Sequence, residues 1–174
     1  ANLEQTYFDI ERNLDKNLFM RLSECTYIDR YENDMITGST GIGKSYIASA
    51  LGNQACTQGY KVLYSNSSKL FSKLKMAKAD GSYLKEIARI EKQDLLILDD
   101  FGLLPLDSYS RATLMEIIED RHGKRSTIIA SQLPIQQWYD IIGEATIADA
   151  ILDRLVHDAH RIELQGESLR KRKK

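Results

Sequence analysis

The segment GSTGIGKS (residues 38–45) has the glycine, lysine and serine spacing of a loop that binds phosphate. Its glycines let the backbone curl so that successive N–H groups point at a bound anion, and the dipole of a following helix stabilises the same charge. Lys44 can reach the β- and γ-phosphates of a nucleotide, while the Ser45 hydroxyl can bind Mg²⁺. The sequence therefore predicts a nucleotide site made by Gly38, Ser39, Thr40, Gly41, Ile42, Gly43, Lys44, Ser45 and Tyr46.

Two acids close the apolar segment DLLILDD (residues 94–100). Such a run is typical of a buried strand whose carboxyl end opens into a ligand crevice. Asp99 is the expected partner of the Mg²⁺ that Ser45 holds. Asp100 points the other way and can polarise a water for attack on a γ-phosphate, or it can cap the following turn, FGLLP. The acid pair favours hydrolysis of the nucleotide.

Polar residues also follow a second strand-like segment, TIIA. Ser131 and Gln132 can sense a γ-phosphate or orient the water there, and a Ser-Gln pair before proline equally suits simple turn chemistry. Arg154, in AILDRLVH, has two readings as well. It either pairs with Asp153 or Asp158 at the surface, or it is an arginine finger that reaches the nucleotide of a neighbouring subunit.

The formal net charge is only −1, so any surface for nucleic acid has to be a local one. Basic residues gather on one helical segment, where they form either a solvated face or a surface that tracks DNA phosphates: Lys69, Lys73, Lys75 and Lys78. The carboxyl end of the sequence is basic too. The histidines lack metal-ligand spacing, and Trp138 is expected in the core.

These residues need a scaffold, and apolar patterning predicts its elements. Strands are expected at 33–38, 61–66, 94–100, 126–132 and 160–164, and helices at 9–23, 45–57, 68–79, 82–92, around 114–118 and at 147–155. Because helices alternate with strands, we expect one parallel sheet covered on both faces. Asp34 interrupts an otherwise apolar strand, and we place it at the strand's open end.

Composition limits the class of protein. The 174 residues suit one α/β domain, and 43% hydrophobic with 28% charged residues is typical of a soluble globular chain. No apolar run approaches the ~20 residues of a membrane span, and the acidic start does not resemble a signal peptide. Cys25 and Cys56 are expected to be reduced core thiols. We therefore expect a cytoplasmic protein.

Four stretches, in this order, resemble an AAA+ ATPase of the IstB/DnaC branch: GSTGIGKSYIASALGNQAC, DLLILDDFG, STIIASQLP and ADAILDRLVHDAHRIELQGES. The last two look more like IstB, the ATP-binding helper of insertion-sequence transposition, than like DnaC. The resemblance implies a P-loop NTPase three-layer sandwich with a parallel five-stranded sheet in the order 5-1-4-3-2, and ATP with Mg²⁺ as cofactors. It also implies an AAA+ core without the C-terminal lid domain.

The resemblance assigns roles to residues. Lys44, Asp100, Gln132 and Arg154 are the expected catalytic residues, Gln132 as a sensor of the γ-phosphate and Arg154 as the arginine finger. Ser45 and Asp99 are the expected Mg²⁺ ligands. The helix from Ser68 onward matches an insertion that contacts DNA in assembled rings or spirals. Asp100 departs from the glutamate that most AAA+ proteins carry. The implied partners are duplex DNA, a transposase and further copies of this chain.

We therefore expect residues 1–32 to be an N-terminal linker or helical segment, 33–165 the AAA+ ATPase domain and 166–174 a basic tail. The family's N-terminal domain is expected to be missing. The leading hypothesis is an ATP-hydrolysing, DNA-binding assembly factor for transposition, and its alternative is a replicative helicase loader. A small-molecule kinase and a nucleotide-gated binding module without turnover are two further hypotheses.

Overall fold

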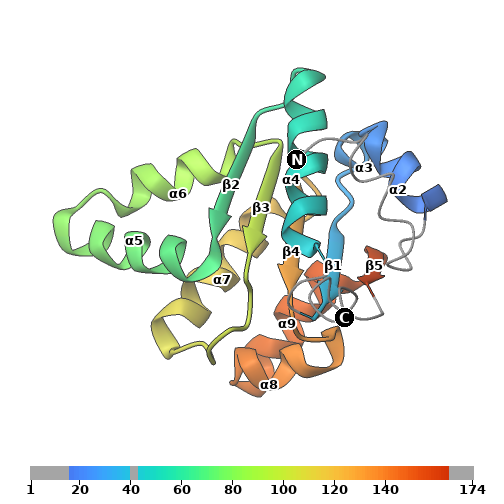
Figure 1. Cartoon of the computed structure of the whole chain (residues 1–174). Coiled ribbons are helices and arrows are strands. Elements are labelled where there is room, and N and C mark those ends of the chain that lie inside the picture. The colour runs from blue at the N-terminus through green and yellow to red at the C-terminus, as the bar shows by residue number, and fades with distance from the viewer. Residues whose placement is uncertain (1–15, 40–42, 165–174) are drawn as a thin grey trace, which may run out of the picture.

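Five parallel strands form one sheet in the computed structural model, which describes residues 16–39 and 43–164 (Figure 1). Their order in the sheet is β2-β3-β4-β1-β5. The strands are β1 (Asp34–Gly38), β2 (Val62–Asn66), β3 (Leu95–Asp99), β4 (Ser126–Ser131) and β5 (His160–Leu164). The expected strand order is therefore confirmed, with β4 between the strand that leads to the phosphate loop and the strand that carries the acid pair.

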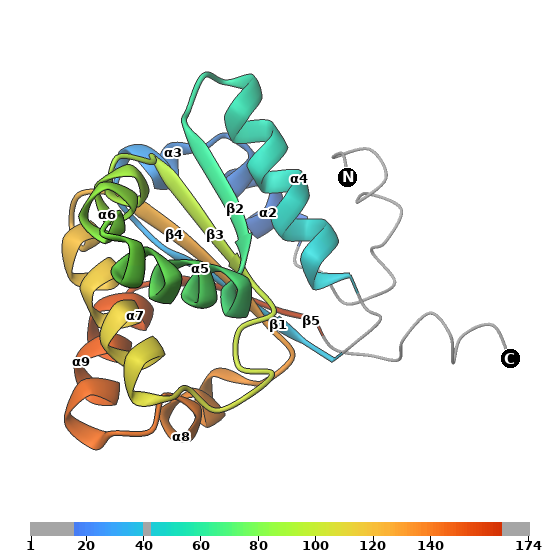
Figure 2. The same cartoon turned by 90° about the vertical axis from the view of Figure 1, so that its left-hand side faces the viewer.

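Helices cover both faces of the sheet, so the fold has the three layers that the resemblance implies (Figure 2). On one face lie α2 (Lys16–Ser23), α3 (Thr26–Asp29) and α4 (Lys44–Thr57). The other face carries α5 (Ser67–Asp80), α6 (Tyr83–Glu91), α7 (Ser108–Arg121), α8 (Trp138–Ile142) and α9 (Ala145–Val156), with a short 3₁₀ turn, Ile135–Gln137, before α8.

The strand β3 shows why a continuous apolar run was the strongest strand signal. Leu95 and Ile97 pack into the cluster under α4, while Leu96 and Leu98 pack into the cluster under α7. All four side chains are fully buried, because a central parallel strand is covered on both faces. Trp138 is fully buried as well, in edge-to-face contact with Phe101, which confirms its expected place in the core.

The predicted amino-terminal segment contributes to this core from residue 16 onward. Leu18, Phe19 and Leu22 of α2 pack with the apolar side chains of α4. Residues 9–15 of the predicted helix lie outside the described residues, as do Thr40, Gly41, Ile42 and the basic tail. Cys25 is a buried free thiol, whereas Cys56 is exposed, so the expectation of two core thiols is wrong for the second.

Asp34 was expected at an open strand end, and that expectation is wrong. It is the first residue of β1 but aligns with Ile128 and His160 of the flanking strands, and it is completely buried. Among the residues that the structure describes, neither carboxyl oxygen has a hydrogen-bond partner, and the buried hydroxyl of Tyr27 has none either. Burial therefore raises the pKa of Asp34 well above its ordinary value, and the charge of Glu32 adds to this shift.

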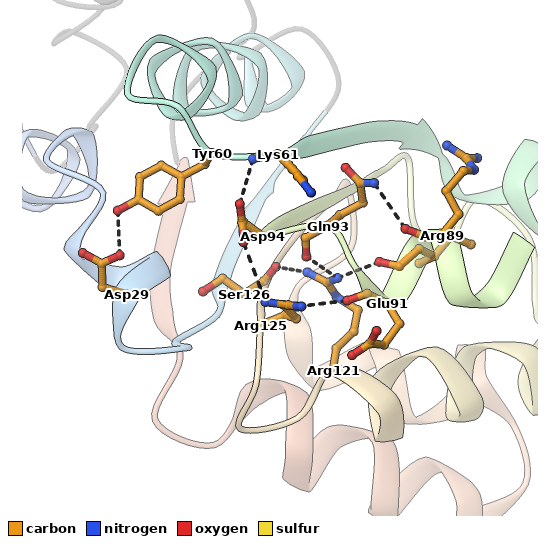
Figure 3. Close-up of polar contacts among 11 residues, drawn as sticks. Asp29, Tyr60, Lys61, Arg89, Glu91, Gln93, Asp94, Arg121, Arg125 and Ser126 are labelled. Carbon is orange, nitrogen blue, oxygen red and sulfur yellow. Dashed lines mark hydrogen bonds and ion pairs between the residues drawn. The ribbon is translucent and has the colours of Figure 1, made fainter.

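Arg121 forms hydrogen bonds to several elements at the end of the sheet that lies away from the phosphate loop (Figure 3). The residue is 2% exposed, and its guanidinium donates to the carbonyls of Ile90 (2.9 Å), Gln93 (2.8 Å) and Ser126 (2.5 Å), and to the hydroxyl of Thr127 (3.2 Å). These partners belong to α6, to the loop before β3 and to the start of β4. Burial lowers the pKa of Arg121 to about 10.

Candidate nucleotide-binding site

The phosphate loop connects the buried strand β1 to the helix α4, as the sequence predicts. Gly43, directly before α4, has φ 92°, a left-handed conformation that favours glycine. The helix begins at Lys44, whose side chain is only 6% exposed. The first N–H groups of such a helix have no partners within the helix and point toward an anion bound before it. Gly38 and Ser39 lie at the other end of the loop.

Ser45 and Asp99 meet at the carboxyl end of β3. The Ser45 hydroxyl donates to Asp99 Oδ1 at 3.0 Å, and the backbone N–H of Asp100 donates to the same oxygen at 2.8 Å. Asp99 is 4% exposed. A hydroxyl and a carboxylate are the hard oxygen donors that Mg²⁺ prefers, so this pair fits the expected metal. Because the hydroxyl uses its proton in the hydrogen bond to Asp99, its lone pairs stay available for a metal.

Tyr64, which was not predicted as a site residue, also contacts Asp99. The hydroxyl of Tyr64, from the neighbouring strand β2, donates a hydrogen bond to Asp99 Oδ2. Partial burial raises the pKa of Tyr64 well above its ordinary value, and the bond to Asp99 adds to the shift. The parallel register that sets Ser65 against Leu98 and Asn66 against Asp99 brings these residues together.

Asp100 lies just beyond β3 and has φ 54°, a left-handed conformation that aspartate tolerates better than most residues. Its Oδ2 accepts a hydrogen bond from Asn66 Nδ2 at 3.2 Å. The Ser67 hydroxyl donates to the backbone carbonyl of Asp99 at 2.9 Å. Asn66 and Ser67 were not predicted as site residues, because only the pairing of β2 with β3 brings them to the acids.

The side chains of Ser131 and Gln132 have different surroundings in the structure. The Ser131 hydroxyl is buried, donates to the carbonyl of Phe101 (2.6 Å) and accepts from the N–H of Leu133 (3.1 Å). These two hydrogen bonds fit the turn chemistry that was one of the two readings of this residue. Gln132 instead lines a pocket of about 250 Å³ beside the start of the phosphate loop, lined also by Thr37, Gly38, Ser39, Pro134, Gln136, Glu163 and Leu164.

Arg154 lies at the other end of the fold. It forms an ion pair with Glu119 of α7 and donates to the carbonyl of Ala150 at 3.0 Å, so neither Asp153 nor Asp158 is its partner. Its helix α9 leads into β5, whose first residue aligns with Asp34 at the start of β1. The phosphate loop follows the opposite end of β1, about 13 Å along the strand. The structure therefore does not bring Arg154 to the nucleotide site of its own chain.

The four predicted DNA-binding lysines are exposed, but they occupy two flanks of α5. Lys69 and Lys73 line a groove of about 620 Å³ together with Glu86 of α6, and the Lys73 ammonium lies 3.5 Å from the Glu86 carboxylate. Lys75 and Lys78 lie on the other flank, with their ammonium groups 5.7 and 4.7 Å from the ring centroid of Tyr109. Figure 1 shows α5 and α6 standing beyond the edge strand β2.

Comparison with known proteins places the chain among proteins with similar sequences. The family model described as IstB-like ATP binding protein matches residues 1–174. Two relatives from Sinorhizobium fredii, named as insertion sequence ATP-binding proteins y4pL and y4uH, are 51% and 44% identical to this chain. The matches cover 97% and 92% of this chain and 69% and 64% of the relatives. The chain thus spans about two thirds of the length of these relatives.

Solved structures support the fold. DnaI aligns with a TM-score of 0.73 at 23% identity, covering 84% of this chain and 83% of that one. The DnaC helicase loader aligns at 0.71 and 18%, covering 84% and 86%. The replication initiator DnaA bound to AMPPCP and single-stranded DNA aligns at 0.69 and 20%, covering 84% and 45%.

Within the described part of the chain, no helix is long and apolar enough to cross a membrane.

Proposed function

The chain belongs to the family of IstB-like ATP-binding proteins, and from this premise we propose that it is a Mg²⁺-dependent ATPase that assembles on duplex DNA and assists a transposase. The observation that carries the proposal is the meeting of Ser45, Asp99 and Asp100 beside the phosphate loop. A site that only held nucleotide needs the loop and a metal ligand, whereas a second acid beside the metal ligand supports activation of a water.

The ATP chemistry follows from these residues. Lys44 neutralises charge on the β- and γ-phosphates, and Ser45 with Asp99 would hold Mg²⁺, which supplies further charge stabilisation when bound. Asp100 accepts a hydrogen bond from the attacking water and orients it toward the γ-phosphorus. The water oxygen bonds to phosphorus as the bond to the β-phosphate oxygen breaks, so ATP and water give ADP and inorganic phosphate.

Two further residues would read the γ-phosphate. Gln132 lines the pocket that begins at Gly38 and Ser39, where an amide can donate to a terminal phosphate oxygen. Arg154 stands away from its own site, so it can act only in a neighbouring copy, after leaving Glu119. A site completed by a second copy is the reason for proposing assembly into a ring or spiral.

For DNA, the proposed contacts are the exposed lysines of α5. Lys69 and Lys73 on one flank and Lys75 and Lys78 on the other place positive charge on the part of the molecule that stands beyond the sheet. A lysine over a tyrosine ring keeps its ammonium protons available for a phosphate oxygen. Contacts of this kind bind any DNA sequence and weaken with salt.

Release of inorganic phosphate, measured with and without duplex DNA, tests this function. We expect Mg²⁺-dependent release that DNA stimulates, and loss of both in Lys44→Ala. Lys124→Ala removes an exposed lysine elsewhere and serves as the matched control. Phosphate transferred to an added acceptor instead would favour a kinase. Nucleotide binding without any release by wild-type protein on DNA would contradict the proposed hydrolysis.

The alternative is a helicase loader, which the likeness to the DnaC helicase loader favours. It uses the same ATP chemistry and differs in its partner. A pull-down with purified transposase and purified replicative helicase separates the two, because each hypothesis predicts retention of one partner only. Retention of the helicase alone would overturn the transposition assignment and leave the ATPase assignment intact.

A further inference from the structure

Every oxygen of the Asp99 carboxylate is in use within this chain. Oδ1 accepts from the Ser45 hydroxyl (3.0 Å) and from the backbone N–H of Asp100 (2.8 Å), and Oδ2 accepts from the hydroxyl of Tyr64. The first two donors suit a metal site, because they fix the carboxylate while the Ser45 lone pairs stay free. The third donor occupies a lone pair of Oδ2, an oxygen that a metal or a metal-bound water would also use.

Tyr64 and Asp99 differ in their freedom to move. Asp99 is 4% exposed and belongs to the central strand β3, whereas Tyr64 is 44% exposed and belongs to the edge strand β2. A half-exposed phenol can turn into water and exchange one hydrogen bond for another at small net cost. The carboxylate, fixed by two donors, has no such alternative. If the contact between them breaks, Tyr64 is therefore the partner that leaves.

We propose that Tyr64 is a displaceable cap on Asp99, which holds the carboxylate in the metal-free protein and must leave when Mg²⁺ enters with the nucleotide. This inference rests on the proposed metal site at Ser45 and Asp99. The phenol proton occupies one lone pair of Oδ2 and draws negative charge from that oxygen, which a metal or its bound water would also use, so the cap raises the Mg²⁺ concentration that tight nucleotide binding requires.

Tyr64→Phe tests the cap, since it removes the hydroxyl and keeps the ring. The measured quantity is the Mg²⁺ concentration that gives half of the full gain in affinity for AMPPCP, followed by calorimetry. We expect this concentration to fall about fivefold, which corresponds to the free energy of losing about one hydrogen bond. If Tyr64 instead positions Asp99 for the metal, the concentration rises, and an unchanged or raised value overturns the cap.

Tyr60→Phe is the matched control. The Tyr60 hydroxyl also donates to an aspartate, Asp29 (2.6 Å), but Tyr60 lies just before the first residue of β2, whereas Tyr64 lies near the carboxyl end of that strand. The variant removes the same chemical group from a tyrosine–carboxylate pair outside the nucleotide site. We expect its Mg²⁺ dependence to match that of the wild type. An equal shift in both variants would also overturn the assignment of the effect to Asp99.

A second measurement follows the phenol itself. In protein labelled with 3-fluorotyrosine, the ¹⁹F resonance of Tyr64 is identified by its absence from Tyr64→Phe. We expect this resonance to move when Mg²⁺ and AMPPCP are added together, and to stay in place with AMPPCP and a chelator. A resonance that does not respond to Mg²⁺ contradicts displacement. Failure of wild-type protein to bind AMPPCP at all is a different result, which refutes the proposed function and not the cap alone.

Discussion

Asn66 connects the carboxylate of Asp100 to the first turn of α5. Its Nδ2 donates to Asp100 Oδ2 at 3.2 Å, and its Oδ1 accepts from the N–H of Lys69 at 3.1 Å, which caps the helix. One amide therefore joins the proposed base of the ATPase to the helix that carries the proposed DNA-binding lysines. A shift of this turn has to change the hydrogen bond at Asp100.

Asn66→Ser separates the two contacts, because serine also caps helices well but is too short to reach Asp100 while it caps. We expect α5 to stay folded and Asp100 to be released, so ATP hydrolysis without DNA rises about threefold and the further stimulation by DNA shrinks. Phosphate release and the helical circular dichroism signal check both parts. Asn66→Asp keeps the cap and replaces the donor by a like charge, so we expect the same direction of change. An unaltered ratio of stimulated to basal rate would refute the connection.

Arg154→Ala should leave nucleotide binding unchanged and lower hydrolysis by the assembled protein about a thousandfold, the usual effect of removing an arginine finger. Mixing Arg154→Ala with Asp100→Asn provides the sharper measurement. Where an Arg154→Ala subunit lies next to an Asp100→Asn subunit, the first supplies an intact nucleotide site and the second an intact arginine. Part of the phosphate release therefore returns. Glu119→Gln removes the arginine's partner in its own chain and should not lower the rate. Mixtures as inactive as each variant alone would show that Arg154 does not act between subunits.

Ser45 and Asp99 were predictable because both belong to local patterns with fixed places in the fold. A glycine-rich loop leads into the helix that carries Ser45, and an apolar run buries the strand that ends at Asp99. In a parallel sheet the carboxyl ends of all strands lie at one edge, so both side chains were expected at that edge even though β4 separates β1 from β3. The same reasoning gave the layers and, with the family resemblance, the strand order.

Tyr64, Asn66 and Arg121 were not predicted, since the partners of the first two and the α6-side partners of Arg121 lie about 30 residues away in the sequence. Nothing in the segment KVLYSN states which strand it pairs with, and the partner strand decides what Tyr64 and Asn66 contact. Arg121 is the last residue of α7, a position that usually suits a surface cation near the helix carboxyl end. Its burial follows from the packing of α6 and β4 around that end.

Arg121→Lys should strongly destabilise the fold. A lysine cannot satisfy the three carbonyls and the hydroxyl that the planar guanidinium reaches, and the unpaired groups stay buried. We expect the free energy of unfolding in urea to fall by about 3 kcal/mol. Arg125→Gln is the control in the same network, because Arg125 is about one third exposed and pairs with Asp94 at 3.7 Å (Figure 3). That pair should contribute below about 1 kcal/mol. Equal losses in the two variants would contradict the role given to Arg121.

Asp34→Asn should stabilise the protein more as the pH rises. The pKa of Asp34 is raised in the folded state by burial, whereas in the unfolded chain it is about 3.9. Above about pH 4 the unfolded chain therefore releases a proton that the folded chain retains, and the free energy of unfolding falls until the folded pKa is passed. The loss is about 1.4 kcal/mol for each unit of pKa difference.

Asparagine has a similar shape and no proton to lose, so the variant lacks this pH dependence. Urea unfolding at pH 4, 6 and 8 should show variant and wild type nearly equal at the lowest pH and a growing advantage for the variant above it. Asp153→Asn, at an exposed position of α9, serves as the control for loss of a carboxylate. A constant difference between Asp34→Asn and wild type at all three pH values would mean that Asp34 carries the same charge in the folded and unfolded chains, which would contradict the raised pKa.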